Sequence, residues 1–141
     1  LLPGDDDRDD GGVVRGAGIT VYSNPQLAGA EDLEGTYVFD LRASHRALRL
    51  NRLFWRFTEP AWRASFAADP EGLMQQAALT EEEKDLMRRH DWIGLIRYGA
   101  SFFVLEKYAR ISKWTNLEVY AAMRGESFET FMQTRRVPDA R

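Results

Sequence analysis

Two histidines are the first candidates for chemistry in this 141-residue sequence, which has no cysteine. His45 lies in an arginine-rich segment, and His90 stands directly before Asp91. A protein metal site needs three or four converging ligands. Each histidine is isolated, so no metal site is predicted. His90 and Asp91 could act as a base with its orienting acid, but sequence neighbours rarely face each other and no nucleophile stands beside them. A helix-terminal histidine beside a capping aspartate is therefore favoured.

Carboxylates are numerous but occupy positions that helices themselves favour. Glu81, Glu82 and Glu83 follow Thr80, where negative charge meets the positive end of a helix dipole. No carboxylate pair stands in an apolar stretch suited to general acid–base work. No glycine-rich phosphate loop occurs, because the glycines are scattered or lie near the N-terminus. We therefore predict no catalytic residue in this chain alone.

Five arginines recur at steps of three or four residues and should line one helix face. They are Arg42, Arg46, Arg49, Arg52 and Arg56. A solvated face is the favoured interpretation, and the alternatives are contact with an acidic protein, an anionic ligand or nucleic acid. The net charge of −3 argues against nucleic acid.

The segment Trp114-Thr115-Asn116 combines a bulky aromatic residue with a loop-to-helix junction. A helix N-terminus presents free backbone N–H groups that can accept a carboxylate. The structural alternative is a core tryptophan followed by an ordinary helix cap.

Composition indicates one globular domain in a reducing compartment. Hydrophobic residues make up 44% and aromatic residues 12% of the chain, which is too apolar for a disordered protein. The absence of cysteine suits a cytoplasmic location. The apolar stretch around Phe102–Leu105 is far shorter than the roughly 20 residues of a membrane span. The N-terminus is acidic where a signal peptide would be basic.

Charge divides the chain near residue 34. Residues 1–34 are acidic and glycine-rich, and we expect an extended, partly disordered arm, with Ile19–Tyr22 as a candidate short strand. Residues 35–141 contain a series of helix start and stop signals. Helix starts are predicted at Asp40, Pro60, Pro70, Thr80, Asp91, Ser101, Thr115 and Ser127, with the first helix running to about Phe57. The fold class is therefore all-α, as a single domain of about seven short helices with this N-terminal arm.

The order of several motifs between about Gly35 and Thr134 resembles a known family. The motifs are Gly35-Thr36-x-Val38-Phe39, Leu50-Asn51, Leu79-Thr80-Glu81 with Lys84, Arg89-x-Asp91, Phe102-Phe103-x-Leu105-x-Lys107 and Met123-x-Gly125. Together they resemble the small α subunit of protocatechuate 4,5-dioxygenase, a class II extradiol dioxygenase. The equivalent domain of gallate dioxygenase is similar.

The resemblance implies a non-catalytic small subunit of a heteromeric ring-cleaving enzyme. In this family the larger β subunit holds Fe(II), and the α subunit caps its active site over a catechol-type substrate. We accordingly expect no cofactor in this chain, a β subunit as its partner, and neither nucleic acid nor membrane as a partner. The alternative is a free-standing interaction module that keeps the fold without a role in ring cleavage.

The resemblance also implies two sets of site residues. The substrate lid is expected at Trp114, Thr115 and Asn116. The partner interface is expected at Phe39, Asn51, Phe54, Trp55, Phe102 and Phe103. Phe54 and Trp55, near a predicted helix end, suit either a core or an interface.

Departures from the family pattern affect the expected lid. Gly99-Ala100-Ser101 replaces a usual Gly-Gly-Asn, and Met123-Arg124-Gly125-Glu126 replaces a usual Met-Thr-Gly-Met. Asn116 stands where the family has a phenylalanine that approaches the substrate. We hypothesise a more polar lid and a substrate other than protocatechuate.

Overall fold

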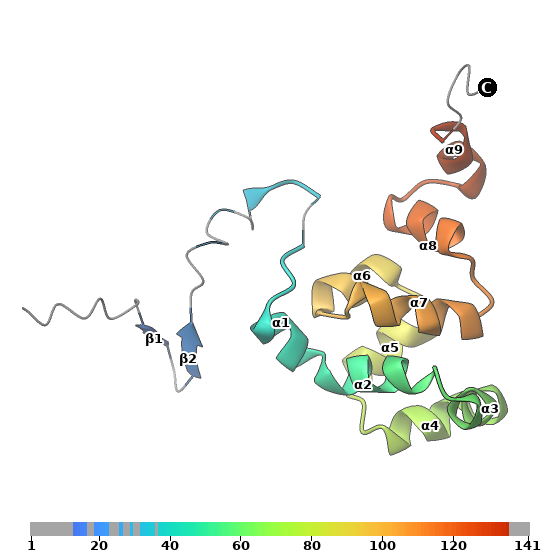
Figure 1. The fold of residues 1–141 in the computed structure, drawn as a ribbon, viewed down its shortest axis with the longest axis horizontal. Coiled ribbons are helices and arrows are strands. Elements are labelled where there is room, and N and C mark those ends of the chain that lie inside the picture. The colour runs from blue at the N-terminus through green and yellow to red at the C-terminus, as the bar shows by residue number, and fades with distance from the viewer. Residues whose placement is uncertain are drawn as a thin grey trace, which may run out of the picture. The chain divides into compact units, whose positions relative to one another are not determined.

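The computed structural model describes residues 13–16, 19–22, 26, 29, 32–35 and 37–135. They fall into two compact units, Leu1–Val38 and Phe39–Arg141. Figure 1 shows the elements of both units, coloured along the chain.

A short β-hairpin forms in the first unit. Strand β1 (Val13–Gly16) pairs with β2 (Ile19–Tyr22) in antiparallel register, with Val13 opposite Tyr22. The candidate strand at Ile19–Tyr22 is therefore present. Strand β1 lies within the arm that was expected to be extended and partly disordered, and its pairing with β2 satisfies backbone groups that a lone strand leaves open. Residues 1–12, 17 and 18 of the same arm lie outside the described residues.

The second unit is all-α, as predicted, and nine helices span its described part. They are α1 (Leu41–Arg46), α2 (Leu48–Arg56), α3 (Pro60–Ala68), α4 (Pro70–Gln76), α5 (Glu81–Arg88), α6 (Trp92–Tyr98), α7 (Phe102–Ile111), α8 (Asn116–Met123) and α9 (Phe128–Gln133). The predicted helix from Asp40 to Phe57 is in fact two helices. They meet at Ala47, which is fully buried and leaves helical geometry with ψ of 19°.

Most helix starts follow the predicted capping chemistry, and the start of α7 is an exception because the Ser101 side chain makes no capping hydrogen bond. Thr80 and Thr115 each form a complete capping box, with Glu83 and Glu118 respectively. Asp40, Asp69, Asp91 and Ser127 accept hydrogen bonds from N–H groups in the first turns of α1, α4, α6 and α9. Pro60 and Pro70 open α3 and α4, where a missing N–H group has no consequence.

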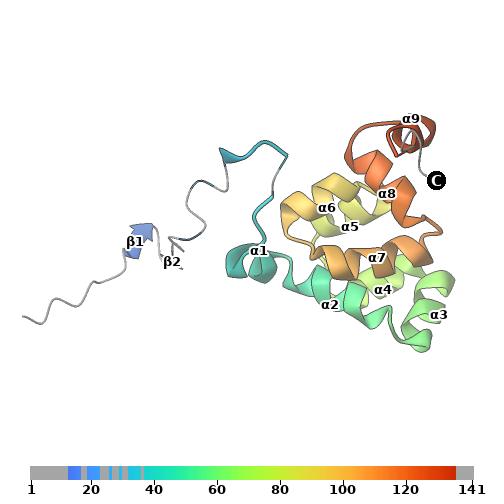
Figure 2. The same ribbon diagram turned by 45° about the horizontal axis from the view of Figure 1, so that its top comes forward.

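The core lies between α2, α5, α6 and α7. Helix α2 packs along α7, and α5 packs against α6, while α3 and α4 lie at one end of this unit and α8 and α9 at the other (Figures 1 and 2). Phe54 and Tyr108 stack at the centre, with ring centroids 4.8 Å apart and planes within 4°. Burial raises the pKa of Tyr108 to about 12, and its hydroxyl donates to the carbonyl of Met87 at 2.7 Å.

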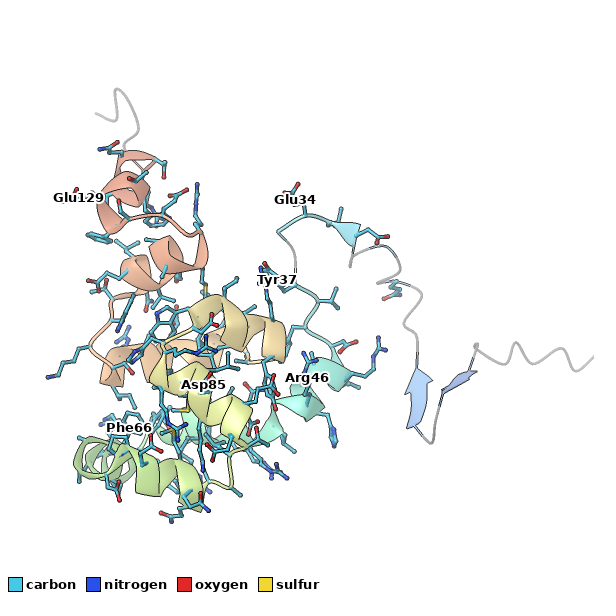
Figure 3. All side chains as sticks on the ribbon, turned by 180° about the vertical axis from the view of Figure 1, so that it is seen from behind. Glu34, Tyr37, Arg46, Phe66, Asp85 and Glu129 are labelled. Atoms are coloured by element: carbon cyan, nitrogen blue, oxygen red, sulfur yellow. The ribbon has the colours of Figure 1, made fainter. Side chains whose placement is uncertain are left out.

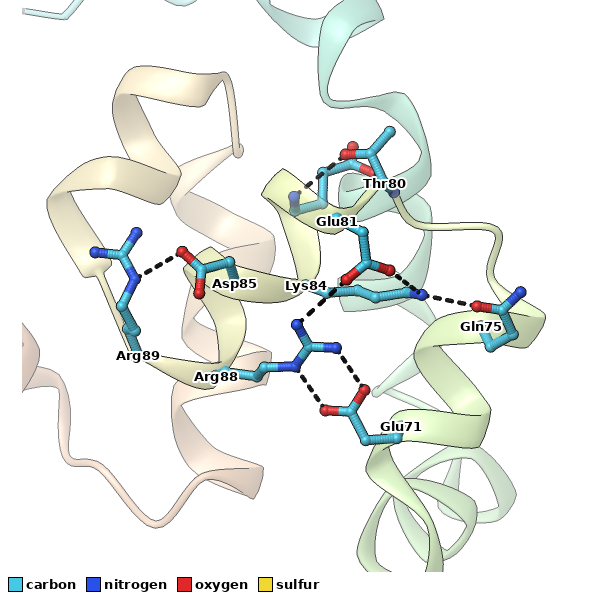
Figure 4. A network of polar contacts seen from close by, with 9 residues as sticks. Glu71, Gln75, Thr80, Glu81, Lys84, Asp85, Arg88 and Arg89 are labelled. Carbon is cyan, nitrogen blue, oxygen red and sulfur yellow. Dashed lines mark hydrogen bonds and ion pairs between the residues drawn. The ribbon is translucent and has the colours of Figure 1, made fainter.

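A polar network joins α4 to α5 (Figure 4). Arg88 forms a two-pronged ion pair with Glu71, with N–O distances of 2.7 and 2.8 Å. The buried ammonium of Lys84 donates to Gln75 at 2.7 Å and to Glu81 at 2.8 Å. Because Lys84 is buried, its two partners are what make its charge tolerable there.

Arg46 ties α1 to the end of α6. Its guanidinium donates to the backbone carbonyls of Arg97 and Tyr98 and lies over the Tyr98 ring. Arg46 is labelled in Figure 3. Carbonyls at a helix C-terminus lack partners within the helix, so a cation there is favourable. Within the described ranges, no helix has the length and apolarity needed to cross a membrane.

Candidate functional site

A carboxylate on α7 joins two polar side chains of α8. The Oε1 atom of Glu106 accepts a hydrogen bond from the Asn116 side-chain amide at 2.9 Å and from the Tyr120 hydroxyl at 3.2 Å. All three side chains are partly buried. Burial and the hydrogen bond to Glu106 raise the pKa of Tyr120, so its hydroxyl stays protonated and donates. We call Glu106, Asn116 and Tyr120 the α7–α8 triad.

Aromatic rings border the triad. Phe102 stacks on Tyr120 with centroids 5.7 Å apart and planes 24° apart. Phe102 and Glu106 are four residues apart on α7, as are Asn116 and Tyr120 on α8, so each pair shares one helix face. Phe103 beside them is 81% exposed. The structure thus brings Phe102, a predicted interface residue, close to the triad that contains Asn116, a predicted lid residue.

The three predicted lid residues occupy different environments. Trp114 packs edge-on against Trp92 at 5.3 Å and is partly buried against the core. Thr115 is exposed and caps α8, and both its backbone N–H and its hydroxyl bond to Glu118 at 2.7 and 2.8 Å. Asn116 alone belongs to the triad. The lid role of all three stays a prediction.

The predicted interface residues divide into an exposed and a buried group. Phe39, Trp55, Phe102 and Phe103 are exposed, Trp55 by 62%. Phe54 is fully enclosed against Tyr108, so of the two roles that the sequence left open for it, the structure gives the core. Partner contact by the exposed group stays a prediction.

Asn51, also assigned to the interface, bonds within the chain. Its side-chain amide donates to the carbonyl of Gly99 at 3.1 Å, and its oxygen accepts from the backbone N–H of Ser101 at 2.8 Å. Gly99 is required there, because its φ is +120° and an added Cβ would lie 2.3 Å from the Ala43 carbonyl oxygen. Asn51 thus fixes the turn from which α7 and Phe102 start.

His90 does not form a dyad with Asp91. It has a φ of +49° and stacks on Tyr108 and Trp114, with ring centroids 5.9 Å away in each case. Burial lowers the pKa of His90, which favours the neutral ring. Asp91 instead caps α6 through the N–H of Gly94. His45 is exposed on α1, and the described residues contain no group of three or more His, Cys, Asp or Glu suited to a metal ion.

The five arginines predicted on one helix face are divided between α1 and α2 by the break at Ala47. Arg46 is engaged at the end of α6, Arg42 pairs with Asp40, and Arg56 pairs with Glu59. Arg49 and Arg52 remain exposed on α2. Three of the five arginines therefore contact groups within this chain.

Sequence reasoning missed Glu106 and Tyr120. The signal was available, since Glu106 follows the exposed Phe102 by four residues and Tyr120 follows Asn116 by four. Their meeting depends on the packing of α8 against α7, which a single sequence does not reveal.

The fold and the triad define a small helical domain whose partly buried polar groups lie on one aromatic-bordered face. Comparison with family models identifies its class. The model described as "Aromatic-ring-opening dioxygenase LigAB, LigA subunit" matches residues 50–136.

This chain belongs to that LigA family. It is 56% identical over 110 residues to the gallate dioxygenase of Pseudomonas putida. The match covers 78% of this chain and 32% of that enzyme, so the chain spans about one third of the length of the curated relative it matches. The resemblance inferred from the motifs is therefore confirmed.

Proposed function

We propose that this chain is the non-catalytic small subunit of a heteromeric extradiol dioxygenase, where it caps the active site of a larger, iron-bearing β subunit. The observation that carries the proposal is membership of the LigA family, whose model is described as the LigA subunit of the aromatic-ring-opening dioxygenase LigAB. We assign the catalytic part of the enzyme to a larger partner chain, because that description names a subunit.

The donor set of the described residues does not fit Fe(II). Non-haem iron takes two histidines and a carboxylate on one face. Here His90 is partly buried and stacks on Tyr108 and Trp114, while His45 is exposed on α1, so the two histidines do not converge. We therefore assign the iron, and with it the redox chemistry of ring opening, to the β subunit.

The exposed aromatic side chains support a protein partner. Phe39, Trp55 and Phe103 are 53%, 62% and 81% exposed, and large aromatic rings are typical anchors at protein interfaces. Covering them would remove apolar surface from water and hold the small subunit in place. The same contact would close the active site to bulk solvent, which strengthens polar interactions with the substrate.

We infer that the α7–α8 triad faces the substrate and binds ring hydroxyls. Glu106 accepts both described hydrogen bonds through Oε1, which leaves Oε2 available to a substrate hydroxyl. The amide oxygen of Asn116 is a second acceptor on the same face. A trihydroxylated ring such as that of gallate offers more donors than a dihydroxylated one. The polar lid hypothesised from Asn116 thus favours a gallate-like substrate over protocatechuate.

Co-purification tests the assembly. The tagged chain is expressed with a candidate β subunit of the same source, and a stable complex with iron in the larger chain is expected. The variant Trp55→Ala should weaken the complex, while Thr130→Ala on α9, whose residue is polar and exposed, serves as the control. A chain that binds no larger subunit, or that retains iron by itself, contradicts the proposal.

A further inference from the structure

A cavity lies on the far side of α7 from the triad. It has a volume of about 320 Å³ and lies among α3, α4, α5 and the end of α7. Apolar side chains line it, namely Phe66, Met74, Met87, Tyr108 and Ile111, of which Phe66 is marked in Figure 3. Tyr108 and Glu106 are two residues apart on α7, so they point to opposite sides of the helix. The cavity is thus separate from the proposed substrate face.

Two lining residues occupy backbone positions that favour glycine. His90 and Lys113 have φ values of +49° and +63°. Each lies just after the end of a helix. The backbone N–H of the next residue donates to a carbonyl five positions earlier, from Asp91 to Leu86 and from Trp114 to Ala109. Glycine is the usual residue at this point because it has no Cβ to strain. Here both positions keep a large side chain, and both side chains line the same cavity.

The charges around the cavity leave one cation uncompensated. Glu71 and Arg88 also line it, but they neutralise each other through their two-pronged ion pair. Lys113 is exposed, and within the described residues its side-chain ammonium has neither an ion-pair nor a hydrogen-bond partner. An apolar cavity with one free ammonium at its edge suits a flat apolar ligand that carries one negative charge.

A buried hydroxyl also lies in the cavity wall. The side-chain oxygen of Ser112 is enclosed and lies beside the hydroxyl of Tyr108, which donates its own proton to the carbonyl of Met87. The Ser112 hydroxyl can therefore donate to the Tyr108 oxygen or to a ligand oxygen that enters the cavity.

We propose that this cavity binds a small aromatic carboxylate, with its ring against Tyr108, His90 and Phe66 and its carboxylate between Lys113 and Ser112. The volume lies at the lower end of the roughly 300–1,000 Å³ typical of small-molecule sites, which limits the ligand to about one ring. The two side chains retained at strained positions then have a role, because His90 contacts the ring and Lys113 the charge.

Methionine methyl groups provide a direct test on the full chain. The sequence has four methionines, of which Met74 and Met87 line the cavity, while Met123 and Met132 lie on α8 and α9. Titration with benzoate should shift the methyl resonances of Met74 and Met87 saturably, with a dissociation constant on the order of 1 mM or tighter. Benzamide, which lacks the charge, should bind about tenfold more weakly.

Matched lysine variants separate the cavity from general charge attraction. Lys113→Gln should weaken benzoate binding about tenfold, and Lys107→Gln, on α7 but outside the cavity, should leave it unchanged. The proposal is overturned if Met74 and Met87 do not shift, or if all four methyl groups shift alike. It is equally overturned if benzamide binds as well as benzoate or if both lysine variants behave the same. Shifts at Met123 alone would place the ligand on the substrate face instead.

Discussion

The side-chain amide of Asn116 donates a hydrogen bond to the carboxylate of Glu106 across 2.9 Å, and this bond joins the first residue of α8 to the middle of α7. Tyr120 shares the same carboxylate oxygen. The orientation of Asn116 is therefore set by a residue ten positions earlier. We expect a substitution of Asn116 or Glu106 to alter the position of the other side chain.

Removal of the triad's charge should impair turnover of a gallate-like substrate by the assembled enzyme. Hydrogen bonds to charged groups are worth about 1.5–3 kcal/mol, so Glu106→Gln should lower kcat/KM by roughly tenfold or more. Glu129→Gln, on an exposed position of α9, is the matched control. Equal kcat/KM for the two variants would exclude Glu106 from substrate binding.

Asn116→Phe should change substrate preference rather than assembly. The variant removes the amide that bonds Glu106 and places an apolar ring on the lid, so the ratio of kcat/KM for gallate to that for protocatechuate should fall by about tenfold. Steady-state kinetics with both substrates measure this ratio. An unchanged ratio together with an unchanged KM shows that Asn116 does not line the substrate pocket.

Alanine substitutions of Phe54 and Trp55, which are adjacent on α2, should differ in their effect on the free energy of unfolding. Phe54→Ala removes a fully buried ring that stacks on Tyr108 and should lower the free energy of unfolding by about 3–5 kcal/mol. Trp55→Ala, at a side chain that is 62% exposed, should change it by less than about 0.5 kcal/mol. Urea denaturation of the isolated chain measures both. A large loss of stability for Trp55→Ala would place that ring in the core.

The capping box at the start of α5 can be tested for its contribution to stability. Thr80 accepts a hydrogen bond from the Glu83 N–H, and Glu83 accepts one from the Thr80 N–H at 2.8 Å. Thr80→Ala should lower the free energy of unfolding by about 1 kcal/mol. Ser65→Ala, at an exposed position inside α3, should be neutral or slightly stabilising. Thermal unfolding of the pair decides whether the cap stabilises α5.

Stability should fall as pH drops below about 6.5 because of His90. Burial lowers its pKa in the folded chain, so the unfolded chain binds a proton first. The contribution is fully present above the unfolded pKa of about 6.5 and is lost between that value and the lower folded pKa. His90→Asn, which tolerates a positive φ, should flatten the stability curve in this window. His45→Gln, at an exposed site, should keep the slope, and a slope retained by His90→Asn would assign it to another group.

Local signals in the sequence were sufficient for the fold class but not for the site. Capping at Thr80, Asp91, Thr115 and Ser127 depends on hydrogen bonds within four residues, so it was predictable from spacing alone. The break at Ala47 was not, because the residues on both sides favour helix and tertiary packing decides it.

Contacts between distant segments account for what the sequence did not reveal. Glu106 meets Tyr120 only because α8 packs on α7, and His90 meets Trp114 only because two helix ends converge. Phe54 and Trp55 are neighbours of similar type, so only the direction of each side chain shows which is core. Such information is three-dimensional, and periodicity in one short helix cannot supply it.

Oxygen uptake in a reconstitution experiment is the most direct test of the central claim. The purified chain, the candidate β subunit loaded with Fe(II), and an equimolar mixture are each supplied with gallate. We expect no ring cleavage by this chain alone and a rise in activity on mixing that saturates at a fixed ratio of the two chains. Ring cleavage by the purified chain, or a β subunit whose activity is indifferent to its presence, would contradict the account.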